Sequence, residues 1–137
     1  MMRRLAVLSC VLGLAACAAP GGGPAAGAPP AAAVRSFVVF FQPWSAALDA
    51  SALSIIAGAA NAAKQHPGLP ITVTGTADPT GSRQANIYLT ETRAQVVLDQ
   101  LVTDGVEAAR IRPLAQGSVQ PALNNQESRR VTIALGG

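Results

Sequence analysis

The sequence predicts an α/β protein of the α+β kind: a two-layer sandwich in which a mixed β-sheet has helices packed on one of its faces. Short runs of branched and aromatic residues alternate with two long stretches of helical periodicity, in the order β-α-β-α-β-β. Proline or glycine stands at most of the boundaries between these stretches. Each helix and the sheet must bury one apolar face, and two packed layers satisfy that need. We expect the folded domain over residues 35–137.

The first half of this domain is expected to hold two strands and one helix. Residues 35–41 (RSFVVFF) are rich in Val and Phe, and a proline two positions later ends the strand that they form. Asp49 or Ser51 can cap the helix that follows, which continues to about Gln65 before a proline-rich segment. Small residues on that helix permit close approach to a sheet. Residues 71–77 (ITVTGTA) alternate in polarity and predict the second strand.

The second half is expected to hold the second helix and two strands. The helix runs from about Ser82 or Arg83 to Asp104 and is closed by a glycine. Residues 111–116 form a third strand, and Pro113 within it favours an edge position or a bulge. A polar loop is expected over residues 117–127. Residues 129–135 (RRVTIAL) alternate again and predict the closing strand.

Composition and charge argue against several classes of function. The formal charge of +3 includes Arg3 and Arg4, and without them eight basic residues face seven acidic ones. No basic stripe with interleaved aromatics is visible, so no nucleic-acid partner is expected. The cysteines, Cys10 and Cys17, precede the domain, which leaves it no disulfide or thiolate metal site. The single histidine, His66, is interpreted as a solvated residue where a helix ends. We expect no cofactor, no metal, no catalytic residue and no enzymatic activity.

The N-terminal segment predicts a lipoprotein. Residues 1–16 hold two arginines, an apolar run too short to span a membrane, and then small residues, which is typical of a signal peptide. The Leu-Ala-Ala-Cys sequence that ends at Cys17 resembles the bacterial lipobox, and this resemblance implies acylation of Cys17, with palmitate among the acyl chains, and sorting to the outer membrane. An ordinary signal peptide, with Cys17 incidental, is the alternative. The rest of residues 17–34 is an uncharged Ala/Pro/Gly linker expected to be disordered.

Polar side chains cluster along residues 75–101, where the second strand gives way to the second helix. Asp78 stands at the strand end and Thr80 in the turn, while Asn86 and Arg93 lie seven residues apart on the helix. A seven-residue step returns to within ~20° of the same helix face. An acid, an amide and a base are therefore expected near one end of an apolar layer, and this arrangement predicts a binding site. Asp78 could also be a simple turn former.

The same stretch carries a motif of wide spacing. The pattern Asn-x-x-Leu-Ser-x-x-Arg-Ala-x-x-Val-x-x-x-Leu is matched, with Thr for Ser, by Asn86, Leu89, Thr90, Arg93, Ala94, Val97 and Leu101. An Asp-x-x-Gly-Ser turn precedes it at Asp78, Gly81 and Ser82, a Val-Phe-Phe run stands at 39–41, and Arg-Arg-Val follows at 129–131. These residues, spread over about 36–135, resemble the OmpA-like peptidoglycan-binding domain family, which includes OmpA, Pal and MotB domains.

The resemblance implies a ligand and a role for each matched residue. The family's ligand is the diaminopimelate residue of the peptidoglycan stem peptide. Asp78 matches the aspartate that pairs with its ammonium group, and Arg93 matches the arginine that holds its carboxylate. Thr80 and Asn86 match polar groups at the border of the pocket, although Asn86 could equally hold the turn. Arg129 matches a basic residue at the rim.

The neighbouring residues Arg130, Gln42 and Trp44 also bear on this assignment. Arg129 shares its side of the closing strand with apolar residues, whereas Arg130 points to the other face, so Arg129 is the better candidate for the rim. Gln42 stands where the family usually has an aspartate, and it would contact the ligand without charge. Trp44 is interpreted as a packing residue.

The resemblance and the leader together imply a function. We expect a lipid-anchored head in the periplasm that binds peptidoglycan non-covalently and tethers the outer membrane to the cell wall. The alternative is a wall-anchored component of a larger envelope machine, of Tol–Pal, secretion or stator type, that acts mainly through a protein partner. The sequence does not name such a partner.

Overall fold

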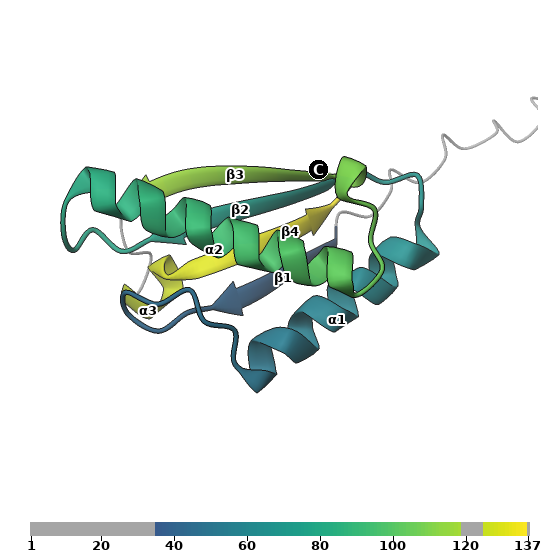
Figure 1. Cartoon of the computed structure of the whole chain (residues 1–137), viewed down its shortest axis with the longest axis horizontal. Helices are drawn as coiled ribbons and strands as arrows, with labels where there is room; N and C mark the ends of the chain where they lie inside the picture. Colours follow the sequence, from purple (N-terminus) through teal and green to yellow (C-terminus); the bar gives the residue numbers. More distant parts are fainter. Residues whose placement is uncertain (1–34, 119–124, 137) are drawn as a thin grey trace, which may run out of the picture. The chain divides into compact units, whose positions relative to one another are not determined.

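A computed structural model describes residues 35–118 and 125–136. The expected signal peptide (1–16), the lipidated Cys17 and the linker (17–34) lie outside these residues. The elements are β1 (Arg35–Phe40), α1 (Ala50–Gln65), β2 (Ile71–Ala77), α2 (Arg83–Thr103), the 3-10 turn η1 (Ala108–Arg110), β3 (Ile111–Ser118), α3 (Asn125–Ser128) and β4 (Arg130–Leu135) (Figure 1).

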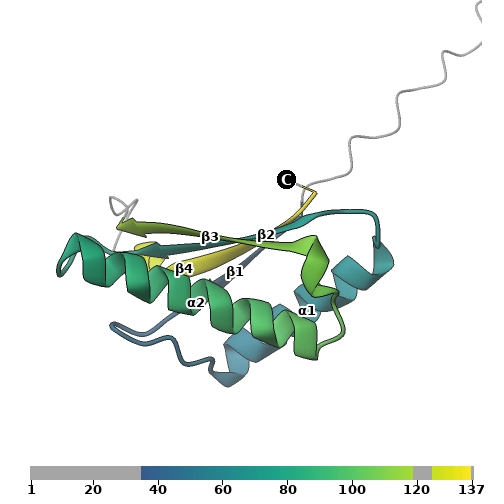
Figure 2. The ribbon, with the colours of Figure 1, turned by 45° about the horizontal axis from the view of Figure 1, so that its top comes forward.

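The four strands form one mixed sheet in the order β1-β4-β2-β3. The closing strand β4 lies between β1 and β2 and is antiparallel to both, whereas β2 and β3 are parallel. A parallel pair needs a crossover, and α2 supplies it. Figure 2 shows α1 and α2 on the same side of the sheet, with α2 over β2 and β3 and α1 toward β1. The predicted α+β sandwich with helices on one face is confirmed.

β3 lies at an edge of the sheet, which is the kind of position that Pro113 favours. Its register against β2 shifts between Gly75 and Thr76, because Gly75 faces Ala115 and Thr76 faces Gly117. Gln116 is therefore the extra residue of a bulge. The expected edge position and irregularity are both present.

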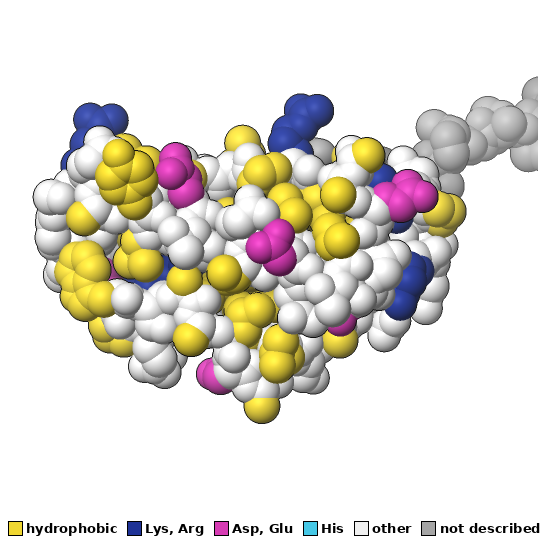
Figure 3. Space-filling view, viewed as in Figure 1, with side chains coloured by type: hydrophobic (Ala, Val, Ile, Leu, Met, Phe, Trp, Pro, Cys, Tyr) yellow, Lys and Arg dark blue, Asp and Glu magenta, His cyan; other side chains and the backbone are white. Residues whose placement is uncertain are grey.

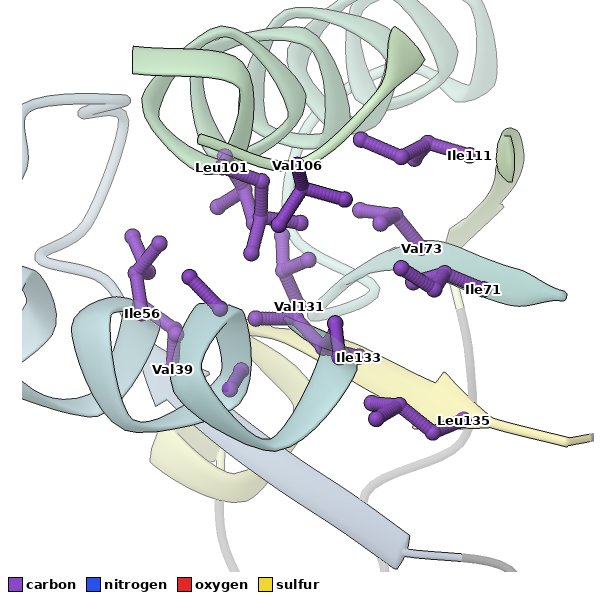
Figure 4. Close-up of a cluster of buried hydrophobic side chains, with 14 of the residues drawn as sticks. Val39, Ile56, Ile71, Val73, Leu101, Val106, Ile111, Val131, Ile133 and Leu135 are labelled. Atoms are coloured by element: carbon purple, nitrogen blue, oxygen red, sulfur yellow. The ribbon is translucent and has the colours of Figure 1, made fainter. Parts of the chain in front are cut away.

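The core fills the space between the sheet and the two helices (Figure 4). Alternate residues of the central strands point into it, and the small residues of α1 allow that helix to approach closely. The fully buried members include Val39, Ile56, Ala59, Ala60, Val73, Val97, Leu101, Val131, Ile133 and Leu135. A rigid layer of this kind gives the polar end of the sheet a fixed support.

The helix ends are capped by side chains. Asp49 caps α1, since its carboxylate accepts a hydrogen bond of 2.7 Å from the backbone N–H of Ala52. Ser82 caps α2 in the same way through Ala85. The prediction of a polar loop over 117–127 is wrong at both ends, since β3 continues to Ser118 and the short helix α3 covers Asn125–Ser128. Its end is held because the Thr76 hydroxyl donates to the Ser128 carbonyl at 2.8 Å.

Gly75 is required where α2 crosses β2, and its replacement by alanine is expected to destabilise the domain. A Cβ at this position would lie 2.4 Å from the backbone oxygen of Thr90. The helix would have to move away from the sheet, which we expect to lower the free energy of unfolding by about 1–3 kcal/mol.

Urea unfolding of Gly75→Ala beside Gly68→Ala checks this expectation, because a Cβ at Gly68 meets nothing within 4 Å. The control should stay within about 0.5 kcal/mol of the wild type. Equal unfolding midpoints for the two variants would show that the close approach carries no cost.

Candidate functional site

The polar residues predicted from the sequence meet at one end of the sheet. Here β1 and β2 end, β4 begins and α2 starts, at the left of Figure 1. In the space-filling view, a small area of acidic and basic surface at this end is surrounded by hydrophobic side chains (Figure 3). The sheet, the turn after β2 and the first half of α2 thus supply the walls of a common site.

Asp78, one residue beyond β2, is held by its neighbours in the turn and by Arg129, which stands just before β4. Its Oδ1 accepts hydrogen bonds from the backbone N–H of Thr80, at 3.1 Å, and from the Thr80 hydroxyl. Its Oδ2 accepts from Nη1 of Arg129 at 3.2 Å, and both side chains of this ion pair are largely buried (11% and 17% exposed). A carboxylate has about four acceptor positions, and these three bonds leave one for a ligand.

Asp78 is therefore ionised at neutral pH. Burial acts to raise the pKa of its carboxyl, but the hydrogen bonds from Thr80 and Arg129, together with the charge of Arg129, outweigh burial and lower the pKa below its ordinary value of 3.8. The site holds a permanent negative charge that an ammonium group can approach.

Arg93 lies in the buried stripe of α2 and is fully buried. Its Nε donates to the Ser45 carbonyl at 2.8 Å, and its Nη2 donates to the Gln42 carbonyl at 2.9 Å. Its guanidinium carbon lies 5.1 Å from the centre of the Phe41 ring, within the range of a cation–π contact. The side chain therefore fixes the loop between β1 and α1.

The third guanidinium nitrogen of Arg93, Nη1, differs from the other two. Nη1 is buried and forms no hydrogen bond with the described residues. Burial lowers the pKa of Arg93, the charge of Arg129 lowers it further, and Asp78 opposes both; a guanidinium nonetheless stays protonated in proteins. A buried, charged donor without an acceptor is costly, and it marks a place where an anion can bind.

Asn86 and Thr80 shape the turn. The Asn86 amide donates to the Asp78 carbonyl (3.2 Å), the Thr80 carbonyl (2.9 Å) and the Ser118 hydroxyl (2.7 Å). These bonds support the structural interpretation of Asn86, which ties the turn to β3. Gln42 takes part through its backbone carbonyl on Arg93, and its side chain is exposed.

The site residues enclose a hollow, which we call the charged pocket. Its lining residues are Trp44, Ala77, Asp78, Asn86, Leu89, Arg93 and Arg129. The volume is about 10 Å³, which is room for about one water molecule. Four of the six predicted ligand-binding residues line the charged pocket, and the other two, Thr80 and Gln42, contact it through Asp78 and Arg93.

Sequence reasoning missed two apolar walls of the charged pocket. Leu89 belongs to the helix motif but had no assigned role. The sequence predicts a packing role for Trp44, yet its side chain is 58% exposed. A signal was present in the sequence: Trp44 is the sole tryptophan, and it stands in a short loop between a proline and a serine.

Comparison with protein families decides the classification. The family model described as "OmpA family" matches residues 40–132 of this chain, which is well over half of its length. The chain belongs to the OmpA family. The matched segment contains every residue of the charged pocket.

Curated relatives of this OmpA-family chain include two proteins named for peptidoglycan. The probable lipoprotein YiaD of Escherichia coli is 34% identical over 103 residues, which cover 71% of this chain and 47% of YiaD. The peptidoglycan-binding protein ArfA of Mycobacterium tuberculosis is 33% identical over 130 residues, which cover 85% of this chain and 39% of ArfA. The peptidoglycan-associated lipoprotein of Agrobacterium fabrum is 30% identical, and the match with this chain covers 59% of its length. The chain thus spans between 39% and 59% of the length of these relatives.

Solved structures share the fold of this OmpA-family domain. The peptidoglycan-associated lipoprotein from Burkholderia pseudomallei superposes with a TM-score of 0.68 at 24% identity, covering 72% of this chain and 89% of the other. The periplasmic domain of Helicobacter pylori MotB superposes with a TM-score of 0.62 at 23% identity, covering 71% and 67%.

Among residues 35–118 and 125–136, no helix has the length and apolarity needed to cross a bilayer. Over the same ranges, His, Cys, Asp and Glu side chains do not gather in groups of three that could hold a metal ion.

Proposed function

We propose that this chain binds peptidoglycan non-covalently, with the diaminopimelate end group of the stem peptide as its ligand. The observation that carries the proposal is the buried, unpartnered Nη1 of Arg93 beside an ionised Asp78. The carboxylate of the end group would accept from Arg93. Its ammonium group would take the remaining acceptor position of Asp78. The carboxylate and the ammonium group of this end group are then each paired with a side chain of opposite charge.

The charge balance of the pocket supports a ligand that brings a carboxylate. Two guanidinium groups, those of Arg93 and Arg129, face the single carboxylate of Asp78. Asp78 already pairs with Arg129, so within the described part of the chain Arg93 is the guanidinium of the pocket that has no carboxylate partner. A planar guanidinium is the side chain best suited to hold a carboxylate. Relatives that are named for peptidoglycan binding and association agree with this ligand.

The proposed role is binding without catalysis. Nucleophilic, acid–base and metal-assisted mechanisms each need a paired set of reactive groups. The residues that line the charged pocket supply one carboxylate that is held by three hydrogen bonds, and two guanidinium groups. These groups are suited to holding charges in place.

The anchor is the second part of the proposal. Residues 1–16 would be removed as a signal peptide, and Cys17 would carry the acyl chains in the outer membrane. More than one acyl chain is needed for stable anchoring. Residues 17–34 would connect the lipid to the head in the periplasm, so that one molecule tethers the outer membrane to the wall. Relatives named as lipoproteins support this arrangement.

Co-sedimentation with purified sacculi tests the ligand site through Asp78→Asn. The substitution keeps the shape of the side chain and removes the charge that the ammonium group needs. A lost charged hydrogen bond is worth about 1.5–3 kcal/mol, so sacculus binding should weaken by tenfold or more. Asp99→Asn is the matched control, because Asp99 is an exposed carboxylate further along α2.

The wild type and the Asp99 variant should pellet with the sacculi, and the Asp78 variant should stay in solution while its circular dichroism remains that of a folded domain. Retention of a folded Asp78→Asn variant at the wild-type level would contradict the assigned site. Release of soluble wall fragments during incubation would contradict the non-catalytic role.

A further inference from the structure

The charged pocket is too small for the ligand that its charges fit. A volume of about 10 Å³ holds about one water, whereas an amino-acid terminus has several heavy atoms. Arg93 is 0% exposed and its Nη1 is buried, so one wall must move before the end group can reach this atom. The identity of that wall follows from how each lining residue is held.

Most of the walls are fixed. Asp78, Asn86 and Arg93 are buried and hydrogen-bonded. Arg129 is bonded to Asp78 and to the Phe41 carbonyl. The two apolar members Ala77 and Leu89 lie within β2 and α2. The four polar members cannot leave without breaking these hydrogen bonds or the ion pair, Ala77 has no side chain that can rotate away, and Leu89 is half-buried.

Trp44 is held differently. Its side chain is 58% exposed, and its indole N–H donates to none of the described residues. The ring lies against the turn at Gly81, where an added Cβ would stand 2.3 Å from Cη2 of the indole. Gly81 has a φ of +87°. The glycine thus provides the flat surface on which the indole rests.

The backbone around Trp44 is fixed even though its side chain is not. Ser45 N–H donates to the Gln42 carbonyl at 3.2 Å, which closes a four-residue turn with Pro43 in the second position. Trp44 occupies the third position with a φ of +53°, where Gly or Asn is the ordinary residue. Arg93 also holds the Gln42 and Ser45 carbonyls on either side. A bulky residue in this conformation is unfavourable for the turn, which points to a use for the side chain.

We propose that Trp44 is a ligand-binding residue and the movable wall of the charged pocket. The indole rotates off Gly81 to admit the diaminopimelate end group and then closes over its methylene chain, while the loop backbone stays fixed on Arg93. Rotation of an exposed side chain is fast and does not disturb the core. Trp44 and Leu89 form the apolar sides between the two charged contacts. This inference rests on the proposed function.

The intrinsic fluorescence of the protein tests the contact directly, because Trp44 is the only tryptophan in the full chain. The probe is a soluble disaccharide-tripeptide that carries diaminopimelate, and calorimetry on the same samples measures its binding. Saturation should shift the emission maximum to shorter wavelength, since the indole loses water when it closes over the ligand. Binding by calorimetry without any change in emission overturns the role of Trp44 and leaves the proposed function standing. No binding by calorimetry overturns both.

Dissociation rates provide the second test. A fluorescein-labelled form of the probe should dissociate about tenfold faster from Trp44→Ala than from the wild type. This factor is the order expected when about two methylene groups of the ligand are no longer buried by the indole. Trp44→Phe should lie between them. Tyr88→Ala is the control, because Tyr88 is 61% exposed and does not line the pocket. An unchanged dissociation rate for Trp44→Ala overturns the proposal; circular dichroism of each variant verifies its fold.

Discussion

Replacement of Arg93 by alanine should remove peptidoglycan binding and also lower the free energy of unfolding by about 3–5 kcal/mol. The large stability cost follows from the burial of the side chain and from its two bonds to the Gln42 and Ser45 carbonyls. Without Arg93 these carbonyls lose a charged donor, and a cavity opens beneath the loop. Thermal unfolding measures the cost, and sacculus co-sedimentation measures the binding.

Arg93→Lys separates the two effects. The lysine keeps the positive charge and most of the volume, but a single ammonium group cannot hold two carbonyls and a ligand carboxylate in one plane. We expect a folded variant, less destabilised than the alanine variant, that binds sacculi much more weakly than the wild type. Arg112→Lys on the exposed surface of β3 is the matched control and should behave like the wild type. A folded Arg93→Lys variant with undiminished binding would exclude Arg93 as the carboxylate anchor.

The sequence predicts the strands and the long helices because their signals are local. Period-two alternation marks 71–77 and 129–135, and the core between them needs only one apolar face on each element. The order of the strands in the sheet is not local, since β4 inserts between β1 and β2 by pairing with residues far along the chain. The short α3 also escaped prediction, because one helical turn has too few residues to show a period.

The candidate site also combines features that the sequence predicts with contacts that only the packed fold reveals. The seven-residue spacing of Asn86 and Arg93 places them on one helix face, and the structure has both in the buried stripe of α2. The spacing does not reveal that Arg93 bonds to the loop after β1, which is more than forty residues away. It also does not reveal the indole of Trp44 over Gly81, because that contact depends on a positive φ in a turn. Such long-range contacts are set by the packed fold.

A wall with lysine in place of diaminopimelate should be bound much more weakly. Lysine ends in an ammonium group alone, so the Nη1 atom of Arg93 would remain buried without an acceptor. The loss of that charged contact should cost about 2–3 kcal/mol, which corresponds to a roughly 30–150-fold weaker affinity. Calorimetry with two soluble muropeptides that differ only in this carboxylate measures the ratio.

The same pair of muropeptides can assign each charge to its partner by a double-mutant cycle. In Arg93→Lys the preference for diaminopimelate should largely disappear, because the variant no longer distinguishes a ligand with the carboxylate from one without it. In Asp78→Asn both affinities should fall by a similar factor, since both end groups carry the ammonium that Asp78 is proposed to hold. The preference itself should therefore survive. The opposite result, with the preference lost through Asp78 and kept through Arg93, would reverse the orientation of the ligand in the charged pocket.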